Sequence, residues 1–216
     1  MRRNQYLKRK KFYDFLLGMP IPIISERCRR RIYDTDFFTE ASAAKTSCAE
    51  AVAQILVAHL DFQTVFDIGC GTGIFLDALH RLGKTVLGCD SSPDALRLSS
   101  KAYPIFLADA TQPILFNTPF DLVVCFEVAE HIPPRNSASL VRNCTTSGRC
   151  IAFTAAPPGQ GGIGHINEKP YAYWIRLFSS HSFVLDPGLT DAIKTDMRKH
   201  NVVPWISANF MCFVPE

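Results

Sequence analysis

The sequence of 216 residues predicts an α/β protein with a doubly wound, mostly parallel sheet of seven strands. Three observations support this fold class. Short apolar runs alternate along the chain with longer stretches whose apolar residues recur every three to four positions, as in strands that alternate with helices. A glycine-rich turn at residues 69–73 follows the first apolar run. Acidic residues end several of the predicted strands, at the edge where an open parallel sheet binds ligands.

The strands are predicted from short apolar runs. The run at 120–126 is almost continuously apolar, which is typical of a strand at the centre of a sheet that is buried on both faces. The seven strands are expected at residues 64–68, 85–89, 104–107, 120–126, 149–154, 183–185 and 208–214.

Helices are predicted between these strands. Residues 42–60 carry apolar residues at a period of 3.6 and lead into the first strand. Gly83 is expected to end the helix after the glycine turn. Ser92 is expected as the N-cap, and Pro93 as the first residue, of the helix after strand two. Further helices are expected at residues 135–144, 171–178 and 189–199.

Composition limits the class of protein. The chain is 47% hydrophobic and 20% charged, as expected for a globular domain with a full core. No apolar run approaches the roughly 20 residues that a membrane span requires. The eight cysteines include no Cys-x-x-Cys pair, which excludes a zinc ribbon and is typical of reduced thiols in the cytoplasm. We therefore expect a cytoplasmic protein without a membrane span.

Charge divides the chain into two parts, a basic N-terminal extension at 1–32 and a domain at 33–216. Residues 1–31 carry ten lysines and arginines against two acidic residues, a net charge of +8, so the remaining residues carry −5. The extension lacks the features of a secretory signal. It is expected either to pack on the domain as a helix or to contact an anionic partner, such as nucleic acid or a membrane surface.

The turn at residues 65–73, Val-Phe-Asp-Ile-Gly-Cys-Gly-Thr-Gly, is the most specific motif. Its alternate glycines allow backbone N–H groups to approach a ligand closely. A dinucleotide fingerprint requires G-x-G-x-x-G, but Ile74 stands where the third glycine would be. Asp67 places a carboxylate beside the turn, which suits a cationic amine better than a pyrophosphate.

At these residues the sequence resembles motif I of the class I S-adenosylmethionine (SAM) methyltransferases. From about residue 33, the chain also resembles a bacterial group of SAM-dependent methyltransferases that are linked to glycan or secondary-metabolite pathways. The stretches that carry this second resemblance are 33–38, 127–133 and 158–168, followed by Tyr173-Trp174 and Leu177-Phe178. The resemblance implies the Rossmann-like class I methyltransferase fold and SAM as cofactor.

The residues expected to bind SAM stand in the glycine turn and at the strand ends. Asp90, about 20 residues after the glycines, is placed to accept both ribose hydroxyl groups. Asp109, with Ala110, is expected to contact adenine, and Asp67 to face the amino-acid end. The full expected set is Asp67, Gly69, Cys70, Gly71, Gly73, Asp90, Ser91, Asp109, Ala110 and Glu127.

Two histidines are predicted as catalytic residues. His131 and His165 are expected at the same edge of the sheet, and an imidazole can remove a proton near neutral pH. The segment E-x-x-E-H and His165 offer a second chemistry, because two carboxylates and two imidazoles can hold a divalent cation such as Mg²⁺. This pattern resembles small-RNA 2′-O-methyltransferases and ubiquinone-pathway O-methyltransferases, although metal-free relatives also carry it. The expected metal ligands are Glu127, Glu130, His131 and His165.

We predict a SAM-dependent methyltransferase that acts on oxygen, less often nitrogen, of a small molecule or glycan. The loop at 155–168 is glycine-rich and ends in polar residues at a strand tip, where substrates are often recognised. Three alternatives remain: an RNA 2′-O-methyltransferase that uses the basic extension, a non-catalytic SAM-binding subunit, and an enzyme of another SAM-dependent reaction. The residues expected at the substrate are Tyr33, Phe37, Asn167, Glu168 and Tyr171.

Overall fold

The computed structural model describes residues 35–100 and 102–216. The basic extension predicted at 1–32, the domain boundary at residue 33 and the substrate candidate Tyr33 lie outside the described residues. The side chain of the second candidate, Phe37, lies outside them as well.

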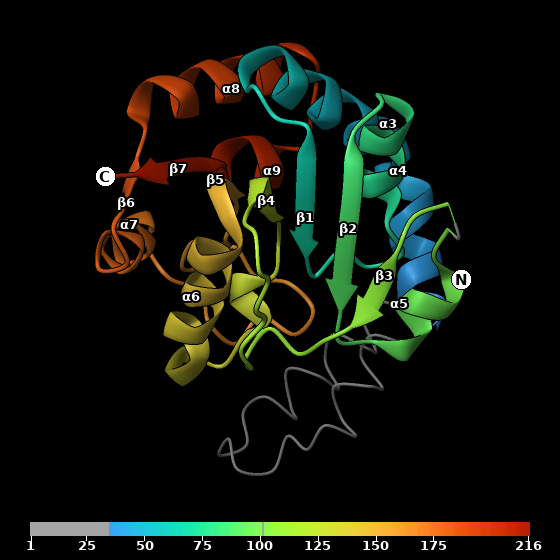
Figure 1. Ribbon diagram of the computed structural model, residues 1–216. Coiled ribbons are helices and arrows are strands. Elements are labelled where there is room, and N and C mark those ends of the chain that lie inside the picture. Colours follow the sequence, from blue (N-terminus) through green and yellow to red (C-terminus); the bar gives the residue numbers. More distant parts are fainter. Residues whose placement is uncertain (1–34, 101) are drawn as a thin grey trace.

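The described chain forms a seven-stranded sheet in the order β3-β2-β1-β4-β5-β7-β6 (Figure 1). The pairs among the first five strands in this order are parallel, whereas β7 runs antiparallel to both of its neighbours. The predicted doubly wound, mostly parallel sheet is therefore confirmed. The strands are β1 (Thr64–Ile68), β2 (Thr85–Asp90), β3 (Ile105–Leu107), β4 (Phe120–Cys125), β5 (Gly148–Phe153), β6 (Phe183–Leu185) and β7 (Met211–Pro215).

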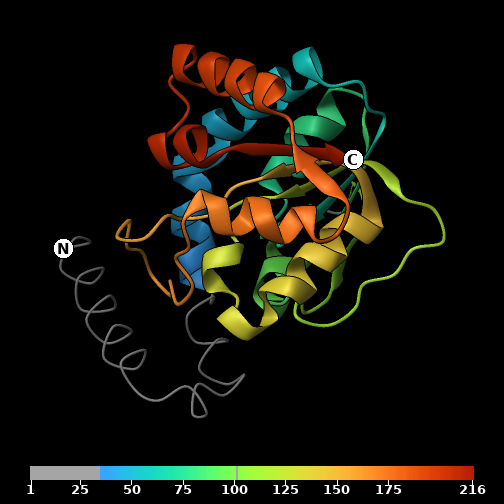
Figure 2. The ribbon, with the colours of Figure 1, turned by 90° about the vertical axis from the view of Figure 1, so that its left-hand side faces the viewer.

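Helices cover both faces of the sheet, with α8 on one side and α6 and α7 on the other (Figure 2). Two 3₁₀ helices, η2 (Ala129–His131) and η3 (Pro134–Asn136), follow β4. No helix of the described chain is both long enough and apolar enough to cross a membrane. The α-helices are α3 (Thr35–His59), α4 (Ile74–Arg81), α5 (Pro93–Leu98), α6 (Ser137–Ser147), α7 (Tyr171–Ser179), α8 (Pro187–Lys199) and α9 (Pro204–Asn209).

Two predicted element starts are wrong by three residues or more. Helix α3 begins at Thr35 rather than at residue 42, because the apolar period that marked the helix covers only its later turns. The last strand begins at Met211 rather than at residue 208, because the chain first forms α9. Pro204 starts this helix, since its fixed φ suits the first helical position.

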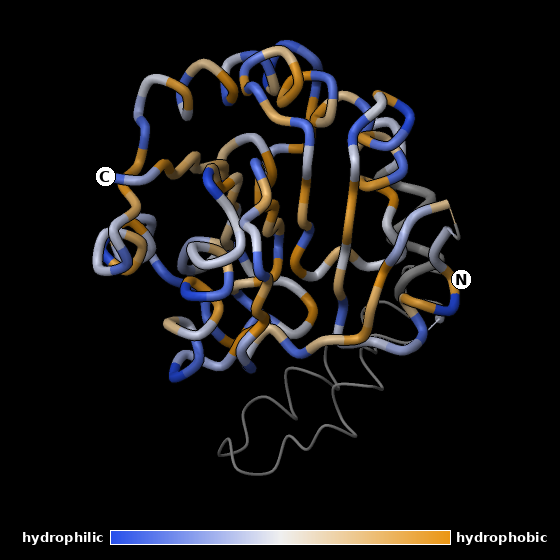
Figure 3. Tube along the Cα trace, viewed as in Figure 1, coloured by the Kyte–Doolittle hydropathy of each residue, from blue (hydrophilic) through white to orange (hydrophobic). Residues whose placement is uncertain are grey.

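Aromatic rings fill the core beneath β1. Hydrophobic residues concentrate along the central strands (Figure 3). The fully buried ring of Phe66 packs against Phe106 at a centroid distance of 6.1 Å, Phe116 at 4.8 Å and Phe120 at 5.5 Å. These rings cover the sheet where the connection from β3 to β4, residues 108–119, forms no helix.

One buried amide anchors this connection. Asn143 on α6 accepts a hydrogen bond from Ile114 N at 3.0 Å. Its Nδ2 donates to the carbonyl oxygens of Ala110 and Gln112 at 2.9 and 2.8 Å. The side chain therefore satisfies three backbone groups that would otherwise lack partners in the helix-free connection. Nothing in the sequence pattern had marked Asn143.

Candidate functional site

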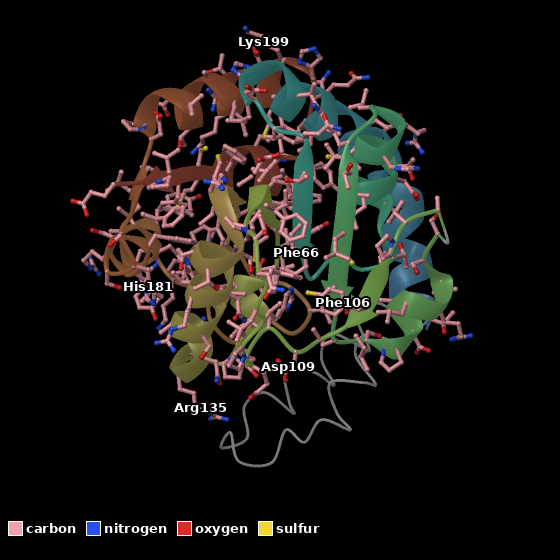
Figure 4. All side chains as sticks on the ribbon, viewed as in Figure 1. Phe66, Phe106, Asp109, Arg135, His181 and Lys199 are labelled. Carbon is pink, nitrogen blue, oxygen red and sulfur yellow. The ribbon has the colours of Figure 1, made fainter. Side chains whose placement is uncertain are left out.

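The strand order reverses between β1 and β4, and a cavity of about 780 Å³ opens beyond the carboxyl ends of these strands. A doubly wound sheet binds ligands at this switch point. Asp109 lies at the same edge of the sheet in Figure 4. The predicted residues that line the cavity are Asp67, Gly69, Cys70, Gly71, Asp90, Ser91, Asp109, Ala110, Glu127, His131 and His165.

The glycine turn needs its glycines for conformation and for close packing. Gly69 and Gly73 have φ angles of 77° and 84°, which L side chains rarely adopt. A Cβ at Gly69 would clash with the side chain of Val128. Gly73 is the N-cap of α4, and its carbonyl accepts a hydrogen bond from the Tyr103 hydroxyl at 2.7 Å. In contrast to the expectation, Gly73 does not line the cavity, so its role in the structure is to start α4.

Two carboxyl groups lie beside the turn, the buried Asp67 and the half-buried Asp90. Asp90 accepts hydrogen bonds from Gly71 N at 2.9 Å and from Ser92 N at 2.8 Å, which fixes the turn against the end of β2. Burial raises the pKa of Asp90 despite these bonds. Burial also raises the pKa of Asp67 to about 8, and the charge of Asp90 adds to the rise. A positively charged ligand group would offset the cost of ionising these residues in the cavity.

Thr154 holds Glu127 at the end of β4. The Thr154 hydroxyl accepts from Glu127 N at 2.9 Å and donates to Glu127 Oε1 at 2.9 Å. Glu127 has a φ of 56°, and a residue held in this region is often found at a functional site. The prediction missed Thr154, although a polar residue at the end of the neighbouring strand β5 was a usable signal.

Glu130, His131 and His165 form a cluster next to the cavity. The imidazole rings of His131 and His165 lie 5.0 Å apart and nearly perpendicular. One ligand atom from each of the three residues lies within 4.8 Å of the others. Glu130 is fully buried, and neither carboxyl oxygen has a hydrogen-bond partner of standard geometry in the described chain. Burial raises the pKa of Glu130 well above its ordinary value, and the nearby Glu127 carboxylate raises it further.

A buried carboxylate that lacks a hydrogen bond of standard geometry, together with two imidazoles, has the chemistry of a donor set for a metal ion. Three of the four predicted metal ligands are therefore brought together. The fourth, Glu127, is not part of this three-residue cluster.

Two predicted substrate residues, Asn167 and Tyr171, form hydrogen bonds with other parts of the protein and do not face a substrate. Asn167 is buried and donates to Ala129 O at 3.1 Å and to Ser137 Oγ at 3.0 Å. The Tyr171 hydroxyl donates to Asn209 Oδ1 at 2.7 Å. Neither residue lines the cavity, in contrast to the expectation.

Glu168 also differs from its predicted place at the substrate. Its carboxylate accepts hydrogen bonds from Gly159 N at 2.7 Å and Gly161 N at 2.6 Å, and it lies 3.0 Å from His165 Nδ1. Partial burial acts to raise the pKa of Glu168, but the hydrogen bonds from His165 and the two glycines outweigh it and lower the pKa. Glu168 does not line the cavity, so it shapes the loop instead.

An apolar wall, which the prediction missed, also lines the cavity. It combines the loop residue Ile163 with α9 and the residue before it, which contribute Val203, Trp205 and Ile206. Trp205 is 43% exposed, so its ring is accessible to a ligand. None of the described residues that line the cavity is lysine or arginine. Helix α9 spans only six residues, too few for a periodic signal.

Comparison with known proteins adds the deciding observation. Residues 66–151 match the family described as a methyltransferase domain, and this range begins in β1 and ends in β5. It contains the glycine turn, the acidic strand ends and the E-x-x-E-H segment. The chain carries a class I SAM-dependent methyltransferase domain. The recognition made from residues 65–73 is confirmed, and SAM is the cofactor of such domains.

The methyltransferase domain is similar to ubiquinone biosynthesis O-methyltransferases of several bacteria. The protein of Albidiferax ferrireducens is 36% identical over 128 residues, which cover 53% of this chain and 46% of the relative. The protein of Pseudomonas paraeruginosa is 32% identical over 157 residues, which cover 68% of this chain and 64% of the relative. The chain thus spans about half to two thirds of the length of these curated relatives.

Solved structures support the fold of the domain. Magnesium protoporphyrin IX methyltransferase of Synechocystis, with bound S-adenosylhomocysteine (SAH), has a TM-score of 0.56 at 20% identity over 67% of this chain and 75% of that chain. A TehB-like SAM-dependent methyltransferase of Corynebacterium glutamicum has a TM-score of 0.56 at 16% identity. The match covers 77% of this chain and 88% of that chain. The class I methyltransferase fold is therefore confirmed.

The affinity for SAM is expected to rise with pH from about 6 to about 8. Below the raised pKa of about 8, the Asp67 carboxyl is protonated, and it must lose its proton before it can pair with the cationic amine of SAM. Binding of SAM then releases up to one proton, so the binding constant rises by up to about tenfold per pH unit. Titration calorimetry at several pH values measures this slope. Asp67→Asn should remove most of it, and a wild-type affinity that does not change with pH would contradict a place for the amine at Asp67.

Proposed function

We propose that this protein transfers the methyl group of SAM to a hydroxyl oxygen of a small-molecule acceptor. The observation that carries the proposal is one cavity at the switch point of the sheet, lined by carboxylates, two imidazoles and an apolar wall. The names of the similar O-methyltransferases support oxygen as the methylated atom.

The residues around the glycine turn suit the parts of SAM. Bound SAM supplies a methyl group on a positively charged sulfur atom. The Asp90 carboxylate has lone pairs left, after its two backbone contacts, to accept the ribose hydroxyl groups. Asp109 and Ala110 line the cavity at the end of β3, where they would contact adenine. Asp67 would pair with the amine, and it would then be ionised.

The part of the cavity that the histidines and the apolar wall line would bind the acceptor. His131 and His165 are the groups that can take a proton from its hydroxyl. The wall formed by Ile163, Val203 and Trp205 favours an acceptor with an apolar or aromatic body over a bare sugar. Acidic lining without lysine or arginine among the described residues disfavours RNA, because phosphate groups require cationic partners.

Two measurements on the full chain test the proposal. The first is titration of SAM and SAH, where binding of both is expected. The second is transfer of labelled methyl from SAM to a panel of phenols, glycosides and short RNAs, where we expect transfer to neutral phenols. Absence of SAM binding by folded protein would refute the proposal. Transfer to RNA alone, lost when residues 1–31 are deleted, would favour an RNA methyltransferase instead. SAM binding without transfer to any acceptor would favour a non-catalytic subunit or another reaction.

We also propose that Glu130, His131 and His165 bind a divalent cation that lowers the pKa of the acceptor hydroxyl. Two imidazoles with one carboxylate suit Mn²⁺ or Zn²⁺ better than Mg²⁺, which prefers oxygen ligands. Chelator-treated protein is expected to bind Zn²⁺ in a calorimetric titration, and Glu130→Gln to weaken this binding at least about tenfold. Glu50→Gln is a matched control, because Glu50 is exposed and contacts only Arg81 in the described ion pairs. Equal binding by both variants would contradict the metal site.

A further inference from the structure

We propose that Cys150 and Cys212 form an oxidation site, at which a peroxide closes the two thiols into an intrachain disulfide. Their sulfur atoms lie 3.7 Å apart, in van der Waals contact, although 62 positions separate the two residues in the sequence. Neither residue lines the cavity or belongs to the cluster of Glu130 and the two histidines. The thiol pair is therefore a site separate from the one described above.

The strand register brings the two thiols together. Strands β5 and β7 pair antiparallel, and Ala152 lies opposite Cys212. Cys150 comes two residues before Ala152, so its side chain leaves the same face of the sheet as that of Cys212. The two side chains are thus diagonal neighbours on adjacent strands, which are close enough to interact.

The two cysteines differ in how they meet solvent. The backbone of Cys212 is held on both sides, because its N–H donates to Thr190 Oγ1 at 3.1 Å and its carbonyl accepts from Asp186 N at 2.9 Å. Cys212 is fully buried, whereas Cys150 is partly exposed. A small oxidant in water therefore reaches Cys150 first, and Cys212 is the thiol in contact with it. An accessible cysteine beside a second, resolving cysteine is the usual arrangement of a redox-sensitive pair.

The contact also favours ionisation of Cys150 over Cys212. A hydrogen bond from the Cys212 thiol lowers the pKa of Cys150 and outweighs the burial that acts to raise it. The same contact, together with burial, raises the pKa of Cys212. Because the thiolate is the nucleophilic form of a cysteine, Cys150 is the attacking thiol and Cys212 the resolving thiol.

Other described cysteines lack this combination of access and reactivity. Cys125 and Cys144 also interact through their thiols, but both are fully buried, so an oxidant in water does not reach them. Cys70 lines the cavity, but burial, with the charges of Asp67 and Asp90, raises its pKa. It therefore remains the less reactive thiol form.

The reaction takes two steps and consumes one hydrogen peroxide. The Cys150 thiolate attacks one peroxide oxygen, the O–O bond breaks, and the other oxygen leaves as hydroxide, which takes a proton to become water. Cys150 then carries a sulfenic acid. The Cys212 thiol loses its proton and attacks this sulfur, the S–O bond breaks, and a second water leaves. The two thiols are thereby oxidised to one disulfide, and their sulfur atoms close from 3.7 Å to about 2.05 Å.

The position of the bond links it to the cavity. Strand β5 leads into the loop at 155–168, and β7 follows α9. This loop and α9 both contribute side chains to the cavity lining. Oxidation would therefore tie together the two strands that adjoin these segments.

Peptide mass spectrometry on the full chain tests the site. Reduced protein, freed of reductant, is treated with hydrogen peroxide, unfolded, alkylated with iodoacetamide and digested. Two of the eight cysteines are expected to escape alkylation, with Cys150 and Cys212 in one cross-linked peptide that dithiothreitol separates. Cys212→Ala should form no such bond and should instead accumulate a sulfenic acid on Cys150, which dimedone traps. Cys48→Ser is the matched control, because Cys48 is also partly exposed, and it should form the cross-link at the wild-type rate.

Alkylation of all eight cysteines, after a peroxide dose that fully oxidises free dithiothreitol, would overturn the proposal. A disulfide between another pair alone would overturn it as well, and so would irreversible oxidation of Cys150 without the cross-link. These three results come from the wild-type protein, so they do not depend on whether Cys212→Ala folds.

Discussion

Replacing Asp90 by alanine is expected to weaken SAM binding by about 10²-fold or more, the largest effect on binding that we predict. The complex with SAM would lose two charge-assisted hydrogen bonds from the ribose to the Asp90 carboxylate, each worth about 1.5–3 kcal/mol. The substitution would also remove the hydrogen bonds from Gly71 N and Ser92 N to Asp90, so the glycine turn would no longer be attached to the end of β2. Titration calorimetry with SAM and SAH measures the change.

Asp94→Ala is the matched control for this prediction. Asp94 lies four residues further on, in the first turn of α5, and its carboxylate pairs with Arg97 at 2.8 Å on the surface. Its replacement should leave SAM affinity within about twofold, because surface pairs contribute little. If folded Asp90→Ala bound SAM within about threefold of the wild type, the ribose would lie elsewhere and the cofactor site would need revision.

Replacing Phe66 by alanine is expected to cost about 3–5 kcal/mol in the free energy of unfolding. The ring is fully buried, and its three phenylalanine neighbours cannot collapse into the space because β3, β4 and their connection hold them apart. Urea unfolding, followed by circular dichroism, measures the change. Leu115→Ala on the same connection is the control, because Leu115 is 79% exposed and should cost less than about 0.5 kcal/mol.

A loss below about 1.5 kcal/mol for Phe66→Ala would contradict this account of the core. It would mean that residues 108–119 rearrange to fill the cavity. The aromatic cluster would then cover the sheet loosely, and Asp109 and Ala110 at the cavity would be mobile with it.

The sequence predicts those parts of the fold whose signals are local. The apolar run at 64–68 and the glycines after it place β1, the turn and Asp67, because strand length, φ angle and ligand approach all depend on neighbouring residues. The acidic ends of β2 and β3 follow from the rule that parallel strands end at one edge. These residues line the cavity, as expected.

Residues outside regular elements are a different case. Asn167 and Glu168 stand in the loop at 155–168, which the sequence predicts as a substrate-recognition segment. An irregular loop, however, has no periodic pattern that shows which way a side chain points. The structure turns both away from the cavity, toward the backbone that they hold. Helix α9 gave no signal because of its length. Thr154 carried a usable signal at the end of β5, but its partner Glu127 is distant in sequence.

The single amide of Asn143 has a consequence for how this chain can vary in length. It fixes the number of residues from Ala110 to Ile114, because three backbone groups in this segment must all hydrogen-bond to the Asn143 side chain. An insertion there would displace Ala110 from the lining of the cavity. Residues 117–119, between Phe116 and β4, are exposed and do not bond to Asn143. Extra residues can therefore be inserted there without moving the site.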